Sequence, residues 1–174
     1  MRGYLSSSYL VALGSNRRHH RYGAPAGVLA AALEELAALG TVSARSPVIA
    51  TAPIGAAQRR FANAAALVES ELDPQAMLAA LQRMEREFGR RRWRRWGDRV
   101  LDLDIVLWDG GVWHSSELAI PHPEFRSRSF VLGPASGIAR DWRDPVSGLS
   151  LAQLHARLTK PRPMPSGATR WKGP

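Results

Sequence analysis

Two aspartates lie one residue apart, directly after the most basic stretch of the chain. Residues 89–105 read G-R-R-R-W-R-R-W-G-D-R-V-L-D-L-D-I, so Asp102 and Asp104 follow a dense run of arginines. Mg²⁺ prefers oxygen ligands and commonly takes one or two carboxylates together with substrate phosphates and water. Arginines bind phosphate through paired, charge-assisted hydrogen bonds. The stretch therefore predicts a site that takes a polyanion and a hard cation together.

The spacing of the two aspartates places them on one face of a strand. Residues 100–108 form a short apolar run that predicts a strand, and side chains at i and i+2 of a strand point the same way. Leu103 and Ile105 would then be buried on the opposite face. Because two close carboxylates repel each other unless a cation neutralises them, we favour a metal site. The alternative is that Asp102 and Asp104 face solvent or pair with the neighbouring arginines.

The basic half of the stretch is a predicted loop that begins where a helix ends at Gly89. Its arginines are Arg90, Arg91, Arg92, Arg94, Arg95 and Arg99. The partial negative charge of a helix C-terminus favours cations at this place. So many cations repel one another, and we expect the loop to order over bound phosphate as a lid. Trp93 and Trp96 either stack on a base or anchor the loop, and packing is the simpler interpretation.

The elements that must position this stretch alternate between strands and helices. Strands are predicted at 9–13, 41–52, 61–69 and 100–108, and helices at 25–39 and 74–88. Pro47 interrupts the second strand, which indicates an edge strand or a bulge. The order strand–helix–strand–strand–helix–strand predicts an α+β, ferredoxin-like fold, with a mainly antiparallel four-stranded sheet and helices packed on it.

The remaining chain is predicted to add smaller elements. Val112 and Trp113 form a short strand, and residues 125–132 form a short helix that Gly133-Pro134 ends. Ser150 is expected to cap a last helix. Residues 160–174 contain four prolines and few apolar residues, so we expect a mobile tail.

Composition limits the classes of function. A chain of 174 residues fits one domain, which we place at residues 1–159. The absence of cysteine excludes disulfides and thiolate metal sites. The formal charge of +9 favours anionic partners. No G-x-x-x-x-G-K-[ST] or G-x-G-x-x-G motif is present, which argues against P-loop and dinucleotide-binding enzymes. No apolar run approaches the roughly 18–20 residues that span a membrane, and we expect a cytoplasmic monomer.

Several segments together resemble one family. The run R-W-G-D-R-V-L-D-L-D-I at 95–105 resembles the signature of 6-hydroxymethyl-7,8-dihydropterin pyrophosphokinase, a folate-pathway enzyme family. Further matching segments follow the family's order: V-A-L-G-S-N at 11–16, T-A-P-I-G at 51–55, F-A-N at 61–63, and P-H at 121–122 with Arg128 and Phe130. His122 is held between two prolines there. The resemblance covers most of residues 8–158.

The resemblance implies an activity and a set of site residues. It implies transfer of the terminal pyrophosphate of ATP to the hydroxymethyl group of the dihydropterin, with release of AMP. Asp102 and Asp104 would hold two Mg²⁺ ions, with Arg90 and Arg92 as the catalytic arginines of a mobile loop. The implied ATP-binding residues are Gln82, Glu85, Arg95, Trp96, Arg99, Ile105, His122 and Arg128. The implied pterin-binding residues are Thr51, Ala52, Ile54, Phe61, Asn63, Trp96 and Phe130, with the two phenylalanines stacking on the ring.

The chain also departs from the family pattern. Ala56 and Ala57 stand where a proline-containing loop is expected, and Glu117 stands where the family has a basic residue beside the nucleotide. Phe61 replaces a common tyrosine, and the arginine loop is one residue short. These differences bear on nucleotide affinity and on the lid more than on the reaction.

Two other functions compete with this hypothesis. A nucleic-acid-binding ferredoxin-like module would explain the +9 charge and the interleaved arginines and tryptophans. It gives no reason for Asp102 and Asp104 to lie in the basic region, because without metal they would repel a phosphate backbone. The third possibility is a catalytically silent scaffold, against which the intact D-L-D motif argues.

Overall fold

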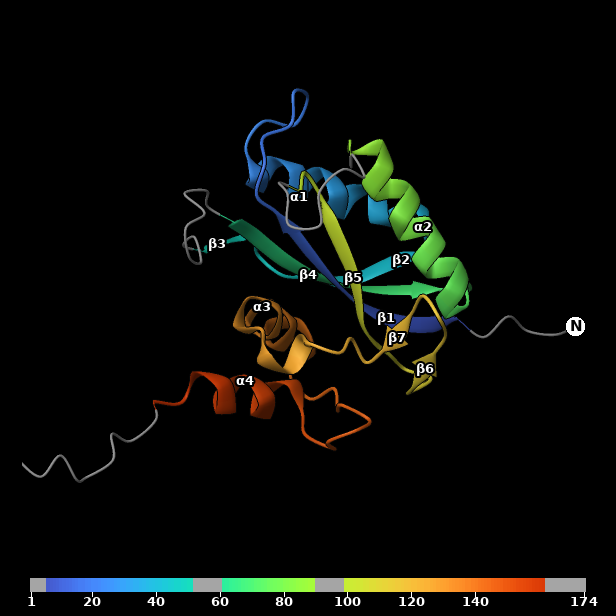
Figure 1. Ribbon diagram of the computed structural model, residues 1–174, viewed down its shortest axis with the longest axis vertical. Coiled ribbons are helices and arrows are strands. Elements are labelled where there is room, and N and C mark those ends of the chain that lie inside the picture. Colours follow the sequence, from blue (N-terminus) through green and yellow to red (C-terminus); the bar gives the residue numbers. More distant parts are fainter. Residues whose placement is uncertain (1–5, 52–60, 90–98, 162–174) are drawn as a thin grey trace, which may run out of the picture.

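In the computed structural model, helices cover both faces of one antiparallel sheet (Figure 1). The structure describes residues 6–51, 61–89 and 99–161. The strands of the sheet are β1 (Ser7–Ser15), β2 (Thr41–Arg45), β3 (Ile49–Thr51), β4 (Phe61–Ser70) and β5 (Asp102–Trp108). The helices are α1 (Pro25–Glu35), α2 (Pro74–Glu87), α3 (Ser129–Ala139) and α4 (Leu151–Thr159), with 3₁₀ turns η1 (Leu36–Ala38) and η2 (Phe125–Ser127). A small hairpin pairs β6 (Trp113–His114) with β7 (Ala119–Ile120).

The sheet confirms the predicted ferredoxin-like topology. Its strands follow the order β2-β4-β1-β5, and every pairing is antiparallel. The sheet has five strands instead of four because the predicted strand at 41–52 is divided at Pro47 into β2 and β3, which both pair with β4. Ser46 bridges the break, since its N–H donates to the Ala65 carbonyl and its hydroxyl accepts from the Ala65 N–H. The edge therefore stays paired although proline lacks a donor.

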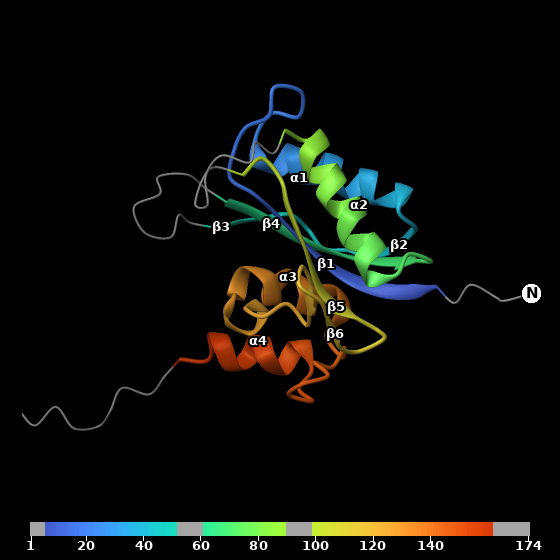
Figure 2. The same cartoon turned by 45° about the vertical axis from the view of Figure 1, so that its right-hand side comes forward.

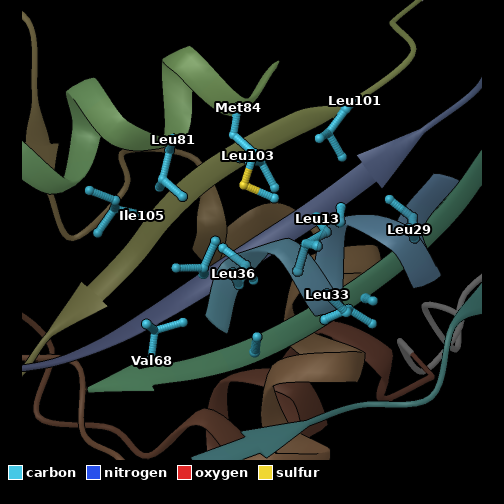
Figure 3. Close-up of a cluster of buried hydrophobic side chains, with 14 of the residues drawn as sticks. Leu13, Leu29, Leu33, Leu36, Val68, Leu81, Met84, Leu101, Leu103 and Ile105 are labelled. Carbon is cyan, nitrogen blue, oxygen red and sulfur yellow. The ribbon is translucent and has the colours of Figure 1, made fainter. Parts of the chain in front are cut away.

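α1 and α2 pack on one face of the sheet, and α3 and α4 on the other, as the two views show (Figures 1 and 2). The α1/α2 side is a continuous aliphatic core (Figure 3). Its labelled members are Leu13, Leu29, Leu33, Leu36, Val68, Leu81, Met84, Leu101, Leu103 and Ile105. Burial of such side chains contributes roughly 1.5–3 kcal/mol each, so this face supplies much of the fold's stability.

Local signals fix the ends of the helices. Asp73 caps α2, and its carboxylate accepts a hydrogen bond of 2.8 Å from the Ala76 N–H. Gly40 follows α1 and η1 with φ 156°, and a Cβ at this position would lie 2.1 Å from the Glu69 carbonyl oxygen. Only glycine lets the chain pass β4 so closely. Ser150 caps α4, as predicted, and the structure adds a reciprocal capping box with Gln153.

The helix predicted at 125–132 is wrong in its bounds. The structure has η2 first, and α3 then continues through Gly133 and Pro134 to Ala139. A proline inside a helix costs about 3 kcal/mol because it removes a hydrogen bond and crowds the preceding turn. Burial offsets this cost, since one side of α3 is buried against the sheet and α4; its buried residues are Val131, Leu132, Pro134 and Ala135.

Among the described residues, no helix is long and apolar enough to cross a membrane.

Candidate active site

Asp102 and Asp104 lie on the face of β5 that α3 covers in part. β5 pairs with β1 so that Gly14 is opposite Asp102 and Ala12 is opposite Asp104. The residue between the aspartates, Leu103, is buried in the α1/α2 core with 5% of its surface exposed. This confirms the predicted alternation, with two carboxylates on one face and aliphatic side chains on the other.

The same face carries predicted pterin residues at a fixed distance from the aspartates. Gly14 pairs with Asn63 on its other side, so Asn63, Gly14 and Asp102 form one row across β4, β1 and β5. Two strand spacings separate the ends of this row, which is roughly 10 Å. Phe61 lies two residues before Asn63 on the same face. The backbone between the two groups carries only the hydrogen of Gly14 and, in the next row, the methyl group of Ala12.

Arg99 neutralises Asp102 directly. Its Nη1 lies 2.5 Å from Oδ1 of Asp102. The Arg99 backbone is itself fixed, since its N–H donates to Oδ1 of Asn16 at 2.8 Å and its carbonyl accepts from the Asn16 N–H at 3.1 Å. Asn16 directly follows β1, so the end of β1 positions a cation against the first carboxylate.

Asp104 lies where its negative charge is disfavoured. Burial raises the pKa of its carboxyl, and the charge of Asp102 raises it further. His122 in its protonated form, Arg128 and Arg99 act in the opposite direction without reversing the shift. A bound cation would lower this pKa and relieve the repulsion.

His122 faces Asp104 from the segment that leads into η2. Its N–H donates to the Val106 carbonyl of β5 at 3.0 Å, and its Nε2 lies 3.9 Å from Oδ2 of Asp104. Burial lowers the pKa of the imidazole, Arg128 lowers it further, and the two aspartates oppose this. The Nδ1 atom accepts from the Glu124 N–H at 3.2 Å. The neutral ring therefore carries its proton on Nε2, the atom that faces Asp104.

Arg128 connects the predicted phosphate and pterin residues. Its guanidinium forms an ion pair with Glu124 and lies 5.9 Å from the centre of the Phe130 ring. Its charge also acts on Asp104. The structure thus brings five predicted site residues to one end of the sheet: Arg99, Asp102, Asp104, His122 and Arg128.

Three predicted nucleotide residues lie on the other side of β5. Gln82 is exposed on α2, and Ile105 is buried in the α1/α2 core. Glu85 is 2% exposed, and its Oε1 accepts a hydrogen bond of 2.8 Å from the Leu103 N–H, so it ties α2 to β5. Their roles beside the nucleotide stay predictions. Glu117, the departure from the family pattern, accepts a hydrogen bond of 3.0 Å from Gln75.

Other predicted site residues lie outside the described part of the chain. They are Ala52, Ile54, Arg90, Arg92, Arg95 and Trp96. The predicted tail from residue 160 also lies largely outside it. Thr51 is described only by its place at the end of β3, opposite Phe61.

The donor set fits a divalent cation that takes ligands from its substrate. In the described residues no three histidine or acidic side chains form a metal-binding group. Asp102 and Asp104 supply two carboxylates on one face of β5, and the raised pKa of Asp104 marks a place where positive charge is favoured. Mg²⁺ suits such a pair because phosphates and water complete its coordination.

Three residues near this site make long-range contacts that had no predicted role: Asn16, Arg126 and Asp144. Asn16 fixes Arg99 across a separation of 83 residues. Arg126 in η2 binds Asp144, which lies 18 residues further along the chain. The only local signal for Asp144 was its place before a proline in a turn, and such a signal does not name a distant partner.

A family model and curated relatives match this chain. The model described as 7,8-dihydro-6-hydroxymethylpterin-pyrophosphokinase matches residues 10–140. A 2-amino-4-hydroxy-6-hydroxymethyldihydropteridine pyrophosphokinase from Haemophilus influenzae is 40% identical over 134 residues, which are 75% of this chain and 81% of the relative. The protein of the same name from Methylorubrum extorquens is 37% identical over 169 residues, which are 95% of this chain and 99% of the relative.

A solved structure shares the fold. The crystal structure of Plasmodium falciparum HPPK-DHPS with pteroate superposes with a TM-score of 0.68 at 13% identity. The match covers 87% of this chain and 44% of that chain, so this protein spans less than half of its length.

Proposed function

The chain belongs to the 7,8-dihydro-6-hydroxymethylpterin-pyrophosphokinase family, and on this premise we propose that it transfers the terminal pyrophosphoryl group of ATP to 6-hydroxymethyl-7,8-dihydropterin. The observation that carries the proposal is the row Asn63–Gly14–Asp102. It sets a predicted pterin residue and a predicted metal residue roughly two strand spacings apart on one face of the sheet.

The reaction needs positioning and charge neutralisation more than covalent help from the protein. The hydroxymethyl oxygen attacks the β-phosphorus of ATP, the bond from that phosphorus to the α–β bridging oxygen breaks, and AMP leaves. The hydroxyl proton is released. Negative charge is spread over the phosphoryl oxygens in the transition state, so cations that already surround them lower the barrier.

Asp102 and Asp104 would hold the magnesium, and we propose two ions. A cation held by these two carboxylates would supply neutralisation of phosphate charge. Arg99 contributes from the side of Asp102, to which it is ion-paired at 2.5 Å. When a cation replaces this pairing, the guanidinium becomes available to a phosphate oxygen.

His122 and Arg128 bind the phosphates from the opposite side. The neutral imidazole presents its Nε2 proton as a hydrogen-bond donor, and Arg128 exchanges the Glu124 carboxylate for a phosphate oxygen. In this proposal, His122 leaves Asp104 and Arg128 leaves Glu124 when phosphate binds. Gln82, Glu85 and Ile105 bind the nucleotide from the other side of β5, together with Arg95 and Trp96. Arg90 and Arg92 act as the catalytic arginines of the loop and neutralise phosphate charge.

The pterin is held by stacking and by hydrogen bonds to its edge. Phe61 and Phe130 stack on the ring, and each contact contributes roughly 0.5–1.5 kcal/mol beyond area burial. Asn63 binds the polar edge of the ring, together with residues 51–54. The buried position of Asn63, with 5% of its surface exposed, suits a side chain that must recognise one ligand edge. A monomeric state remains a prediction.

The decisive test is the nucleotide product. The protein is incubated with ATP, Mg²⁺ and 6-hydroxymethyl-7,8-dihydropterin, and the nucleotides are separated by chromatography. We expect AMP only when the pterin is present. Formation of ADP, or AMP formation that ignores the pterin, would contradict the proposal. Tight, salt-sensitive RNA binding without AMP would instead favour the nucleic-acid module.

A further inference from the structure

We propose that the ion pair between Arg126 and Asp144 is a positioning device that sets His122 and Arg128 against the two aspartates. This inference rests on the proposed function, because it assigns the pair a role in ATP binding. Neither residue faces Asp102 or Asp104, so the effect must pass through the backbone of η2.

The pair has the geometry of a fixed clamp. Nε of Arg126 lies 2.7 Å from Oδ2 of Asp144, and Nη2 lies 2.7 Å from Oδ1. Two parallel hydrogen bonds of this kind define the plane of the guanidinium as well as its position. The Asp144 side chain is fully buried, whereas 32% of the Arg126 side chain is exposed. The clamp therefore has a fixed acidic end and a basic end at the surface.

The acidic end is held by the turn that joins α3 to α4. The Asp144 carboxylate also accepts hydrogen bonds from the N–H groups of Val146 and Ser147 at 3.2 Å and from the Ser147 hydroxyl at 2.5 Å. Its backbone N–H donates to the Leu149 carbonyl at 2.9 Å. Asp144 is thus a rigid anchor point beneath η2.

Arg126, the basic end, links the anchored Asp144 to the segment that carries His122 and Arg128. The Arg126 guanidinium packs over the ring of Phe125 at 4.7 Å, and Phe125 is fully buried. The backbone on either side is joined by longer bonds: the Phe125 N–H donates to the His122 carbonyl at 3.2 Å, and the Arg128 N–H to the Phe125 carbonyl at 3.3 Å. Bonds of this length are at the weak end of the range, so η2 depends on its side-chain anchors.

The clamp also distinguishes two nearby arginines, Arg126 within η2 and Arg128 directly after it. Asp144 holds Arg126, and Arg128 is the residue whose charge reaches Asp104. Without Asp144, the partly buried Arg126 would lose its carboxylate partner and would have to move. Its movement would displace Arg128, two residues further along, and His122, four residues before it. Small displacements of phosphate ligands have large effects on binding and turnover.

The test compares Asp144→Asn and Arg126→Gln with a matched control. Ser150→Ala removes the capping box of α4 from the same α3–α4 region and leaves the clamp intact. Binding of a non-hydrolysable ATP analogue with Mg²⁺ is measured by calorimetry, and turnover by AMP formation, both well below the melting temperature. We expect the two clamp variants to weaken analogue binding and to raise KM for ATP by about tenfold, with KM for the pterin nearly unchanged.

The control separates positioning from stability. Ser150→Ala should lower the melting temperature but keep both KM values. Arg126→Lys keeps the positive charge but cannot form the paired hydrogen bonds of the guanidinium. We expect it to destabilise the fold less than Arg126→Gln and to give an intermediate KM for ATP. If clamp variants with lowered melting temperatures bind the analogue as tightly as the unmodified protein, the pair is only structural and the inference fails. If the unmodified protein binds the analogue but forms no AMP, the proposed function fails instead.

Discussion

The two faces of the sheet are built differently, and β5 belongs to both. Toward α1 and α2 it presents Leu103 and Ile105, which are almost completely buried in the aliphatic core. Toward α3 it presents Asp102 and Asp104, which remain partly exposed. One strand therefore supplies stability with alternate residues, and the residues between them are the ones to which we assign the chemistry. The proposed site therefore lies on a strand whose other face is packed in the core, although the charge of Asp104 is disfavoured there.

The cost of the chemical face is visible in Asp104. Burial and the charge of Asp102 raise the pKa of this carboxyl, so the folded protein disfavours its ionised form. No comparable penalty applies to Leu103 on the other face. Proteins often retain such unfavourable charges where function needs them. Substitutions on the two faces should therefore have opposite effects on activity and stability.

Asp104→Asn should show the largest effect, on activity. Loss of a carboxylate from the proposed metal site would remove several kcal/mol of charge stabilisation, so we expect AMP formation to fall about 10³-fold or more. The free energy of unfolding at pH 7 should stay equal or rise, because a group whose pKa is raised on folding destabilises the native state once it is ionised. AMP assays and urea unfolding of the same preparation measure both quantities. Normal AMP release by this variant would remove Asp104 from the metal site.

Leu103→Ala should show the reverse pattern. Truncation of a fully packed leucine costs about 2–5 kcal/mol of unfolding free energy. The backbone that positions Asp102 and Asp104 should stay in place. We expect a much lower midpoint in urea with nearly unchanged turnover per folded molecule at low temperature. Leu158→Ala is the matched control, since Leu158 is 39% exposed and should lose little. A turnover loss as large as that of Asp104→Asn would show that the faces are not separable.

The clamp beneath η2 predicts a pH effect of intermediate size. Burial would raise the pKa of Asp144, but hydrogen bonds from Arg126, Ser147 and Val146 outweigh it and lower the pKa to about 2. A lowered pKa stabilises the fold fully above the unfolded value near 3.9, and this stability is lost as the pH falls toward about 2. The contribution is about 2 kcal/mol, from a difference of nearly two pKa units.

Asp144→Asn should therefore lack this part of the acid dependence. Urea unfolding between pH 5 and pH 2 measures the effect, with the difference between the two proteins shrinking as the pH falls. Ser150→Ala serves again as the control, because it lowers stability without a titrating group. A constant difference between Asp144→Asn and the unmodified protein over this range would mean that the carboxylate is not the source.

The sequence predicted what depends on short-range periodicity. The alternation in β5, the Ser150 cap of α4 and the interruption of the edge strand at Pro47 are all local consequences of residue type. What it missed depends on distance along the chain. Arg126 and Asp144 are 18 residues apart, and α3 continues through Pro134 only because tertiary packing buries that side. Local propensity depends on residues nearby in the sequence, so it cannot predict contacts that form only when the chain has folded.

Gly14 offers the smallest and most specific test of the chemical face. It lies between Asn63 and Asp102, and a Cβ there would meet Oδ1 of Asn63 at 3.6 Å, an ordinary contact distance. Gly14→Ala should therefore change the unfolding free energy by less than about 1 kcal/mol in either direction. Glycine weakens a strand, so its replacement can offset the closer contact with Asn63.

The expected effect of Gly14 substitutions is on the pterin and not on the fold. If the ring lies over this row, a methyl group raises KM for the pterin by a few-fold, and the larger side chain in Gly14→Val raises it by about tenfold or more. KM for ATP should change less, because the phosphate ligands lie beyond Asp102. Ala65→Gly is a control that removes bulk from the same face at β4, one row away. If Gly14→Val keeps the KM for the pterin while the protein remains folded, the substrate does not lie over the row, and Asn63 loses its assigned role.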